Sequence, residues 1–112
     1  MEVTATAKFI RIAPRRARLV AQRVKGLTPE EALATLAFVP HRAAAVIAKV
    51  VRSAAANAES NYGLDRDALT VRVVHVDEGP SLRRLRPKAR GRAGFYRKRS
   101  SHITVVVDDG SE

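Results

Sequence analysis

The fold is decided by LTVRVVHV (residues 69–76), HITVVV (residues 102–107) and the stretch between them, GPSLRRLRPKARGRAGFYRKRS (residues 79–100). The two flanking segments are rich in β-branched residues and roughly alternate, which is typical of strands. A loop as long as the intervening stretch is usually functional or disordered inside a compact domain. We therefore expect both strands to continue into residues 79–100 and to form an extended β-hairpin.

Residues 79–100, called the basic arm below, contain nine Lys or Arg residues and no acidic residue. Like charges at this density repel one another, and an isolated two-stranded ribbon is only marginally stable in water. Seven of the nine are Arg, whose planar guanidinium can hold a phosphate with two hydrogen bonds. The arm therefore suits a phosphate backbone, and the expected RNA contacts are Arg83, Arg84, Arg86, Lys88, Arg90, Arg92, Arg97, Lys98 and Arg99. The alternative is a disordered basic tail, although such tails seldom lie between two strands.

Before these strands, the sequence predicts one further strand and a first helix. Val3 to Phe9 alternates apolar and polar residues, which is typical of a half-buried strand. Pro14 suits the first position of a helix, and Gly26 is placed to end it. Apolar residues at helical spacing form the expected buried stripe of this helix: Ala17, Val20, Ala21 and Val24.

Two more helices are expected. The capping box Thr28-Pro-Glu-Glu31 begins one, and Pro40 stops it. A longer helix covers about residues 41–60 and closes at Asn61-Tyr-Gly63. Its expected buried residues are Ala43, Val46, Ile47, Val50, Val51 and Ala54.

Together these elements predict an α+β fold, a small antiparallel three-stranded sheet packed on three helices with a long basic β-hairpin extension. A chain of 112 residues suits a single domain. We expect a globular part formed by residues 1–78 and 101–108, the extended arm at 79–100 and a short acidic tail at 109–112. A hydrophobic content of 46% argues against wholesale disorder.

The net charge of +10 implies a polyanionic partner: nucleic acid, an anionic membrane surface or an acidic protein. A second basic cluster supports nucleic acid, because it lies around the start of the first helix, apart from the arm. Its members are Lys8, Arg11, Arg15, Arg16 and Arg18. A solvated helix face is the alternative for this cluster. For the cations of the third helix, Arg42, Lys49 and Arg52, the two interpretations stay open.

Catalytic residues, metal ligands and cofactors are not expected. His41, His75 and His102 lie far apart, and no pair has a ligand spacing such as i, i+4. We expect them to be structural or surface residues. Asp77 and Glu78 precede the arm and are expected to pair with the cations at its base. There is no Cys, no glycine-rich nucleotide loop and no evident Ser–His–Asp set.

Membrane insertion is not expected either. The longest uninterrupted apolar run, Ala43–Ala48, is far shorter than the roughly 20 residues that span a bilayer. The first residues lack the layout of a signal peptide. We therefore expect a soluble, intracellular protein.

Five short stretches occur in a characteristic order: RIAPR (11–15), SAAANA (53–58), VDEGP (76–80), PKARGRA (87–93) and KRSSHIT (98–104). Over nearly its whole length the chain thereby resembles the bacterial-type large ribosomal subunit protein 22 family. One departure is Ala13, where the family commonly has Ser before the Pro. Ala removes a side-chain N-cap, at a typical cost of about 1 kcal/mol, and puts the helix start in question.

The resemblance implies a structural, cytoplasmic protein of the large ribosomal subunit. Its globular domain would lie on the outer ribosome surface near the polypeptide exit, with the hairpin running inward beside the nascent-chain tunnel. Family members bind large-subunit ribosomal RNA, assist early assembly and contact neighbouring ribosomal proteins; no homo-oligomer is expected. The tip near the nascent polypeptide, which influences macrolide sensitivity in the family, would be Lys88, Ala89, Arg90, Gly91, Arg92 and Ala93.

Two rival functions are compatible with a basic β-arm. An architectural DNA-binding protein wraps the minor groove with such an arm, usually as a dimer with an apolar wedge at the tip. The tip sequence PKARGRA contains no bulky wedge. A membrane-surface or general polyanion-binding module is the third interpretation, which competition between anionic vesicles and RNA would test.

Overall fold

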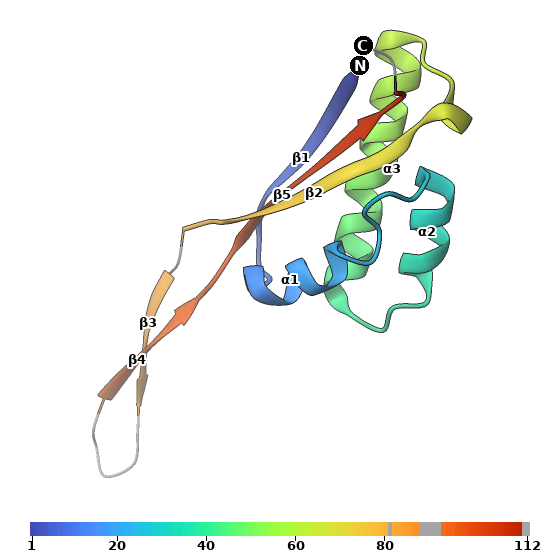
Figure 1. Cartoon of the computed structure of the whole chain (residues 1–112). Helices are drawn as coiled ribbons and strands as arrows, with labels where there is room; N and C mark the ends of the chain where they lie inside the picture. Colours follow the sequence, from blue (N-terminus) through green and yellow to red (C-terminus); the bar gives the residue numbers. More distant parts are fainter. Residues whose placement is uncertain (81, 88–92, 111–112) are drawn as a thin grey trace.

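The computed structural model describes residues 1–80, 82–87 and 93–110. The main sheet has three antiparallel strands in the order β1-β5-β2 (Figure 1): β1 (Glu2–Ile10), β5 (Ser101–Asp108) and β2 (Thr70–Glu78). The helices are α1 (Pro14–Ala21), α2 (Pro29–Ala37), α3 (Arg42–Tyr62) and the short 3-10 helix η1 (Arg66–Ala68). β3 (Leu82–Pro87) and β4 (Ala93–Lys98) pair antiparallel in a separate sheet. The sheet and three helices confirm the predicted α+β class.

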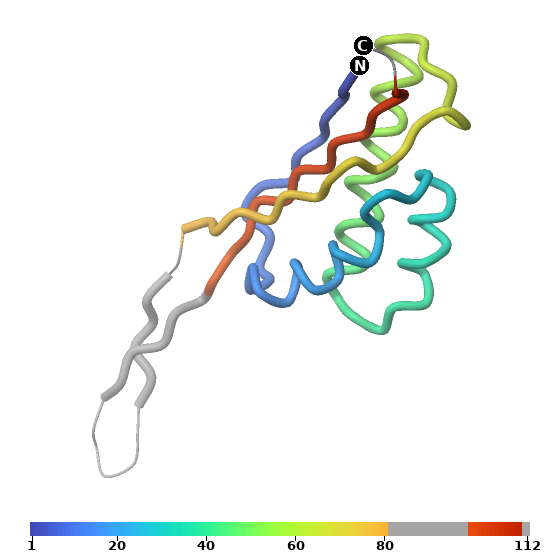
Figure 2. The backbone as a smooth tube through the Cα atoms, viewed as in Figure 1, coloured from blue at the N-terminus to red at the C-terminus, as the bar shows by residue number. Residues whose placement is uncertain are grey.

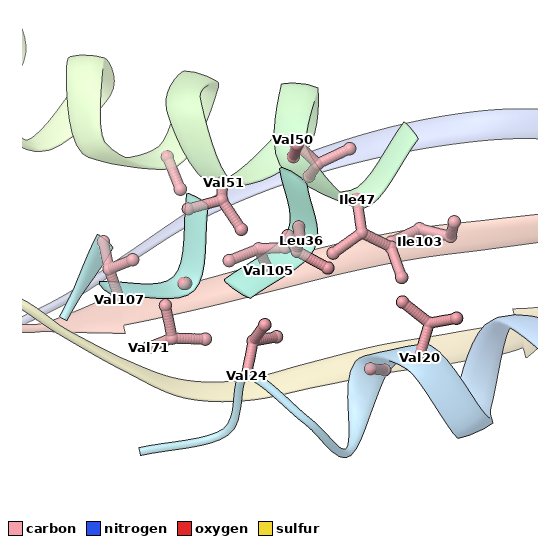
Figure 3. Close-up of a cluster of buried hydrophobic side chains, with 14 of the residues drawn as sticks. Val20, Val24, Leu36, Ile47, Val50, Val51, Val71, Ile103, Val105 and Val107 are labelled. Carbon is pink, nitrogen blue, oxygen red and sulfur yellow. The ribbon is translucent and has the colours of Figure 1, made fainter. Parts of the chain in front are cut away.

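The core lies between the main sheet and the helices. α3 packs against β1 and β5, α1 packs against β2, and α2 packs on α3. Figure 3 shows Ile47 and Val51 of α3 pointing toward Ile103 and Val105 of the central strand β5. Each such side chain contributes about 1.5–3 kcal/mol when it is fully buried. The central strand therefore joins the helix layer to both outer strands, although it comes last in the chain.

The long helix α3 is close to its predicted form. Its start is capped by His41, whose Nδ1 accepts a hydrogen bond from the N–H of Ala43 (3.1 Å). Gly63 ends it with a left-handed φ of 62°. Of the predicted stripe only Val46 is half-buried, and the others are buried. The predicted helix start at Thr28 is confirmed for α2, because the Thr28 hydroxyl accepts from the N–H of Glu31 (3.2 Å).

The first helix ends earlier than predicted. α1 stops at Ala21, and residues 22–26 form turns instead of one more helical turn up to Gly26. The cause is β2, because the N–H of Gly26 donates to the carbonyl of Val71 (2.7 Å). The N–H of Val71 in turn donates to the carbonyl of Leu27 (2.7 Å). Val24 is nevertheless fully buried, so the predicted apolar stripe is confirmed although its helix is shorter.

The first strand also departs from prediction at its end. Phe9 was expected on the half-buried face, and this expectation is wrong, because the residue is 64% exposed. The register of β1 against β5 shifts between Ala7 and Ile10, which marks a β-bulge, and Phe9 adopts a left-handed φ of 59°. Ile10 packs against the core in its place. A bulge changes which side chains point inward, so simple alternation fails beyond it.

The amino terminus lies beside the end of β5 at the far end of the main sheet, as the tube in Figure 2 shows. The amino group of Met1 lies 3.3 Å from an oxygen of Asp108 and 3.0 Å from an oxygen of Asp109. Arg72 pairs with Glu2 and with Asp108 (3.2 Å) across the same strand ends. Asp109 was assigned to an acidic tail, but here it contacts the amino terminus. In the described part of the chain, no helix combines the length and apolar character needed to cross a membrane.

Candidate nucleic-acid interface

The basic arm leaves the main sheet between Gly79 and Ser100, a place called the arm root below. The N–H of Gly79 donates to the carbonyl of Ser100 (2.9 Å), and the Ser100 hydroxyl donates to the carbonyl of Pro80 (2.7 Å). A Cβ on residue 79 would lie only 2.6 Å from the Ser100 hydroxyl oxygen. Only Gly fits at position 79 while the Ser100 hydroxyl stays where it is. The two hydrogen bonds hold the chain segments that enter the arm close together.

A second contact attaches the arm root to the segment between β1 and α1. The hydroxyl of Ser101, which is fully buried, donates to the carbonyl of Ile12. The neighbouring residues Arg11, Arg15 and Arg16 are exposed. The fold thus brings the basic start of α1 beside the arm root, although about 90 residues of chain separate them. Sequence spacing alone did not indicate that the two basic clusters adjoin.

Arg18 differs from the other cations of α1. Its Nε and Nη2 both donate to the carbonyl oxygen of Val76, at 3.1 and 2.9 Å. Val76 lies on β2, an outer strand of the sheet, so Arg18 ties α1 to that edge. A groove of about 320 Å³ runs along this junction, lined in part by Gln22, Lys25 and His75. Arg18 therefore has a structural role that the sequence did not reveal.

Most cations of the globular part have no acidic partner. Among the side chains that the structure describes, those of residues 1–80 and 99–110, the ion pairs involve only the amino terminus, Arg66 and Arg72. The cluster at the start of α1 and the third-helix cations are exposed: Lys8, Arg11, Arg15, Arg16, Arg42, Lys49 and Arg52. Their positive charge is left for an external anion.

The structure describes the backbone of some of the predicted arm residues but not of others. Arg83, Arg84 and Arg86 belong to β3, and Arg97 and Lys98 belong to β4. Arg99 is exposed at the arm root. Lys88, Ala89, Arg90, Gly91 and Arg92 lie outside the described residues, so the predicted tip remains a prediction except that Ala93 begins β4.

The histidines have no metal-binding arrangement. His41 caps α3, and His102 accepts a hydrogen bond at Nδ1 from the N–H of Phe9 (3.1 Å). No group of three or more His, Cys, Asp or Glu residues in the described part of the chain could hold a metal ion. Asp77 and Glu78 are exposed at the end of β2. Their expected pairing with arm cations stays a prediction, because those side chains are not described.

A small basic α+β protein with a large excess of unpaired exposed cations is typical of a structural nucleic-acid-binding protein. Comparison with known proteins shows which family of this class the chain belongs to. Residues 5–108 match the family described as ribosomal protein L22p/L17e, and the chain belongs to that family. It is accordingly a structural, non-enzymatic protein of the large ribosomal subunit, located in the cytoplasm within the ribosome.

Individual relatives agree over the full chain. The large ribosomal subunit protein uL22 of Desulforamulus reducens is 54% identical over 112 residues, covering 100% of this chain and 99% of the relative. The protein of the same name from Lawsonia intracellularis is also 54% identical, covering 100% of both chains. That of Roseiflexus castenholzii is 48% identical, covering 100% of this chain and 99% of the relative. The predicted family resemblance is thereby confirmed.

Proposed function

We propose that the protein binds large-subunit ribosomal RNA through two adjoining surfaces, the basic arm and the exposed cations at the start of α1. The observation that carries this proposal is the junction at the arm root. There the Ser101 hydroxyl donates to the carbonyl of Ile12, so the arm root lies beside the start of α1. An RNA that contacts Arg11 and Arg15 then meets the root of the arm without any rearrangement of the globular part.

The strand register within the arm supports a polyanionic partner. The pairing of β3 with β4 puts Arg83 directly opposite Arg97. Like charges opposite one another on antiparallel strands are destabilising. A phosphate beside the two Arg residues would remove this repulsion, and Arg binds phosphate with a two-pronged geometry. The arm is thus expected to gain stability when it is bound to RNA.

The mechanism is scaffolding during assembly. The globular part docks on the RNA surface, while the arm passes between RNA segments, neutralises their phosphates and runs along the exit tunnel beside the nascent polypeptide. If the arm neutralises about six phosphates, the logarithm of affinity should fall with the logarithm of salt concentration at a slope of about −4 to −5. Neighbouring large-subunit proteins complete the site, and the free protein is expected to be a monomer.

A charge-reversal experiment tests RNA binding. Replacing Arg84, Arg90 and Arg92 together by Glu should weaken binding to large-subunit ribosomal RNA and make the salt slope shallower, with the globular part still folded. The matched control reverses Arg42, Lys49 and Arg52 on α3, which changes the net charge equally. Equal losses in the two variants would mean that the arm has no special part in binding, and unchanged affinity in the arm variant would contradict the proposal.

The position of the tip needs a separate test. The chain contains no Cys, so Arg90→Cys introduces one unique thiol. In large subunits assembled with this variant, we expect a thiol cross-linker to join residue 90 to a stalled nascent chain. A control thiol at Glu59→Cys, on the exposed side of α3, should give no such product. Cross-linking from residue 59 but not from residue 90 would rule out the proposed placement of the arm.

A further inference from the structure

Phe9 is an exposed aromatic side chain on a strained backbone. Its φ of 59° is an outlier for a bulky residue, because the side chain crowds the backbone there. Phe9 gains little from burial, since the residue is 64% exposed. A strained conformation persists only when the surrounding structure enforces it, and such positions concentrate at functional sites. Packing in the core therefore does not account for the strained conformation of Phe9.

Two contacts with His102 hold Phe9 in place. The N–H of Phe9 donates to Nδ1 of His102 (3.1 Å), and the two rings meet edge to face with centroids 4.9 Å apart at 89°. His102 itself lies on the central strand β5, next to the buried Ser101. These contacts fix the orientation of the Phe9 ring while leaving much of its surface open to solvent.

The ring also lies at the arm root. His102 is within reach of Gly79, where an added Cβ would lie 3.4 Å from Cε1 of His102. The next residues along the chain on either side of the bulge include the exposed cations Lys8 and Arg11. In Figure 1 the end of β1 lies where the main sheet gives way to the arm and where α1 begins. An open aromatic ring therefore lies within two residues along the chain of two exposed cations that are proposed to hold phosphates.

We propose that the Phe9 ring is a stacking platform for one unpaired base of ribosomal RNA, an inference that rests on the RNA-binding function proposed above. Sequence-specific and structure-specific RNA contacts favour splayed-out bases, which stack on aromatic side chains while nearby cations hold the backbone. In an edge-to-face contact at least one flat face of the Phe9 ring stays clear of His102, and this face is the one available to a base. The exposed cations near Phe9 in the chain suit the phosphate of a nucleotide better than they suit the surface of a protein partner.

A fluorescent variant tests the stacking directly. The chain has no Trp, so Phe9→Trp creates a single indole at this position. A base stacked on the indole should quench its emission when large-subunit ribosomal RNA is added. The control is Tyr62→Trp, at the last position of α3, whose end lies near the amino terminus and away from the arm root. Emission from residue 9 that changes no more than emission from residue 62 would overturn the proposal.

An affinity measurement provides the second readout. Phe9→Leu keeps an apolar side chain but removes the aromatic face, and it should weaken RNA binding by about fivefold or more. The salt slope should stay unchanged, because no phosphate contact is lost. Tyr62→Leu should leave affinity unchanged. Unaltered affinity in Phe9→Leu would count against stacking, and a shallower slope would show that the variant disturbs the cations instead.

These outcomes separate the stacking proposal from the function on which it depends. If the arm reversal weakens binding but the indole at residue 9 is not quenched, RNA binding stands and the stacking role fails. If neither the native protein nor any variant binds the RNA at low salt, both fail. A purely structural role for Phe9 predicts lower stability of the free Phe9→Leu protein with normal RNA affinity once folded, which chemical denaturation and binding measured together would show.

Discussion

Arg18 on α1 donates two hydrogen bonds, at 3.1 and 2.9 Å, to the carbonyl oxygen of Val76 on β2. The N–H of Gly79 donates to the carbonyl of Ser100, the residue just before β5, and backbone groups alternate in direction along an antiparallel strand. The backbone groups of Val76, three residues earlier, therefore point away from β5 toward the open edge of the sheet. Arg18 satisfies a carbonyl that has no strand beside it, and it joins the first basic helix to the strand that leads into the arm.

Replacing Arg18 by Ala should lower the free energy of unfolding by about 1 kcal/mol, because a charge-assisted contact to the backbone is lost. Arg18→Lys should restore little of this, since an ammonium cannot reproduce the planar two-pronged contact. Urea denaturation measures both. Arg15→Ala, which removes an exposed cation of the same helix, serves as the control and should leave stability unchanged. Equal destabilisation by the two Ala variants would mean that the Val76 contact contributes nothing specific.

Gly79→Ala should destabilise the arm root by about 1–3 kcal/mol, because its Cβ would meet the Ser100 hydroxyl oxygen at 2.6 Å. Ser100→Ala removes that oxygen together with its hydrogen bond to Pro80. In the Gly79→Ala/Ser100→Ala double variant the clash is relieved, so the combined loss should be smaller than the sum of the two single losses. A double-mutant cycle on unfolding free energies measures this coupling. Strict additivity would show that the steric conflict is not real.

Gly26→Ala should cost about 1–2 kcal/mol of stability although an added Cβ would meet no atom within 4 Å. The penalty comes from the φ of 86°, which a Cβ makes unfavourable. Gly26→Asn should cost less, because Asn tolerates the left-handed region better than Ala does. Thermal denaturation ranks the three proteins. If Ala proves as stable as Gly, then residue 26 does not hold a left-handed conformation in solution.

The cluster of charges at the chain termini should make stability depend on pH in both directions. The pKa of Asp108 is lowered from its ordinary 3.8, first by the backbone N–H of Gly110 and then by the amino terminus and Arg72. Its contribution is therefore present above 3.8 and lost as pH falls through the lowered pKa. The pKa of the Met1 amino group is raised from 8.0, chiefly by its hydrogen bond to Asp109, so its contribution is lost as pH rises through that raised pKa.

Asp108→Asn provides the matched measurement. The variant should melt at a lower temperature than the native protein near neutral pH, and the two should converge once pH is below the lowered pKa of Asp108. Added salt should shrink the difference, because these groups are exposed and screened. A difference that persists undiminished at acid pH would mean that Asp108 stabilises the strand ends through something other than its charge.

Local sequence patterns were sufficient to predict the elements whose conformation is set by interactions between residues close together in the chain. Apolar periodicity and capping residues depend on residues one to four positions apart. They predicted the buried stripe of α3, the start of α2 at Thr28 and the three strands of the sheet. The order of five short motifs was equally sufficient for the family. The charge of residues 79–100 also predicted, by itself, a polyanionic partner.

The tertiary structure alone decided the features that rest on contacts between distant residues. α1 stops at Ala21 because Gly26 bonds to Val71, 45 residues away along the chain. Phe9 turns outward because His102 accepts its N–H, and no alternation within β1 records that. The adjacency of the two basic clusters depends on Ser101 bonding Ile12. A hydrogen bond between residues far apart in the chain does not depend on the spacing of apolar and polar residues near them. The sequence pattern therefore does not predict it, and only folding brings its donor and acceptor together.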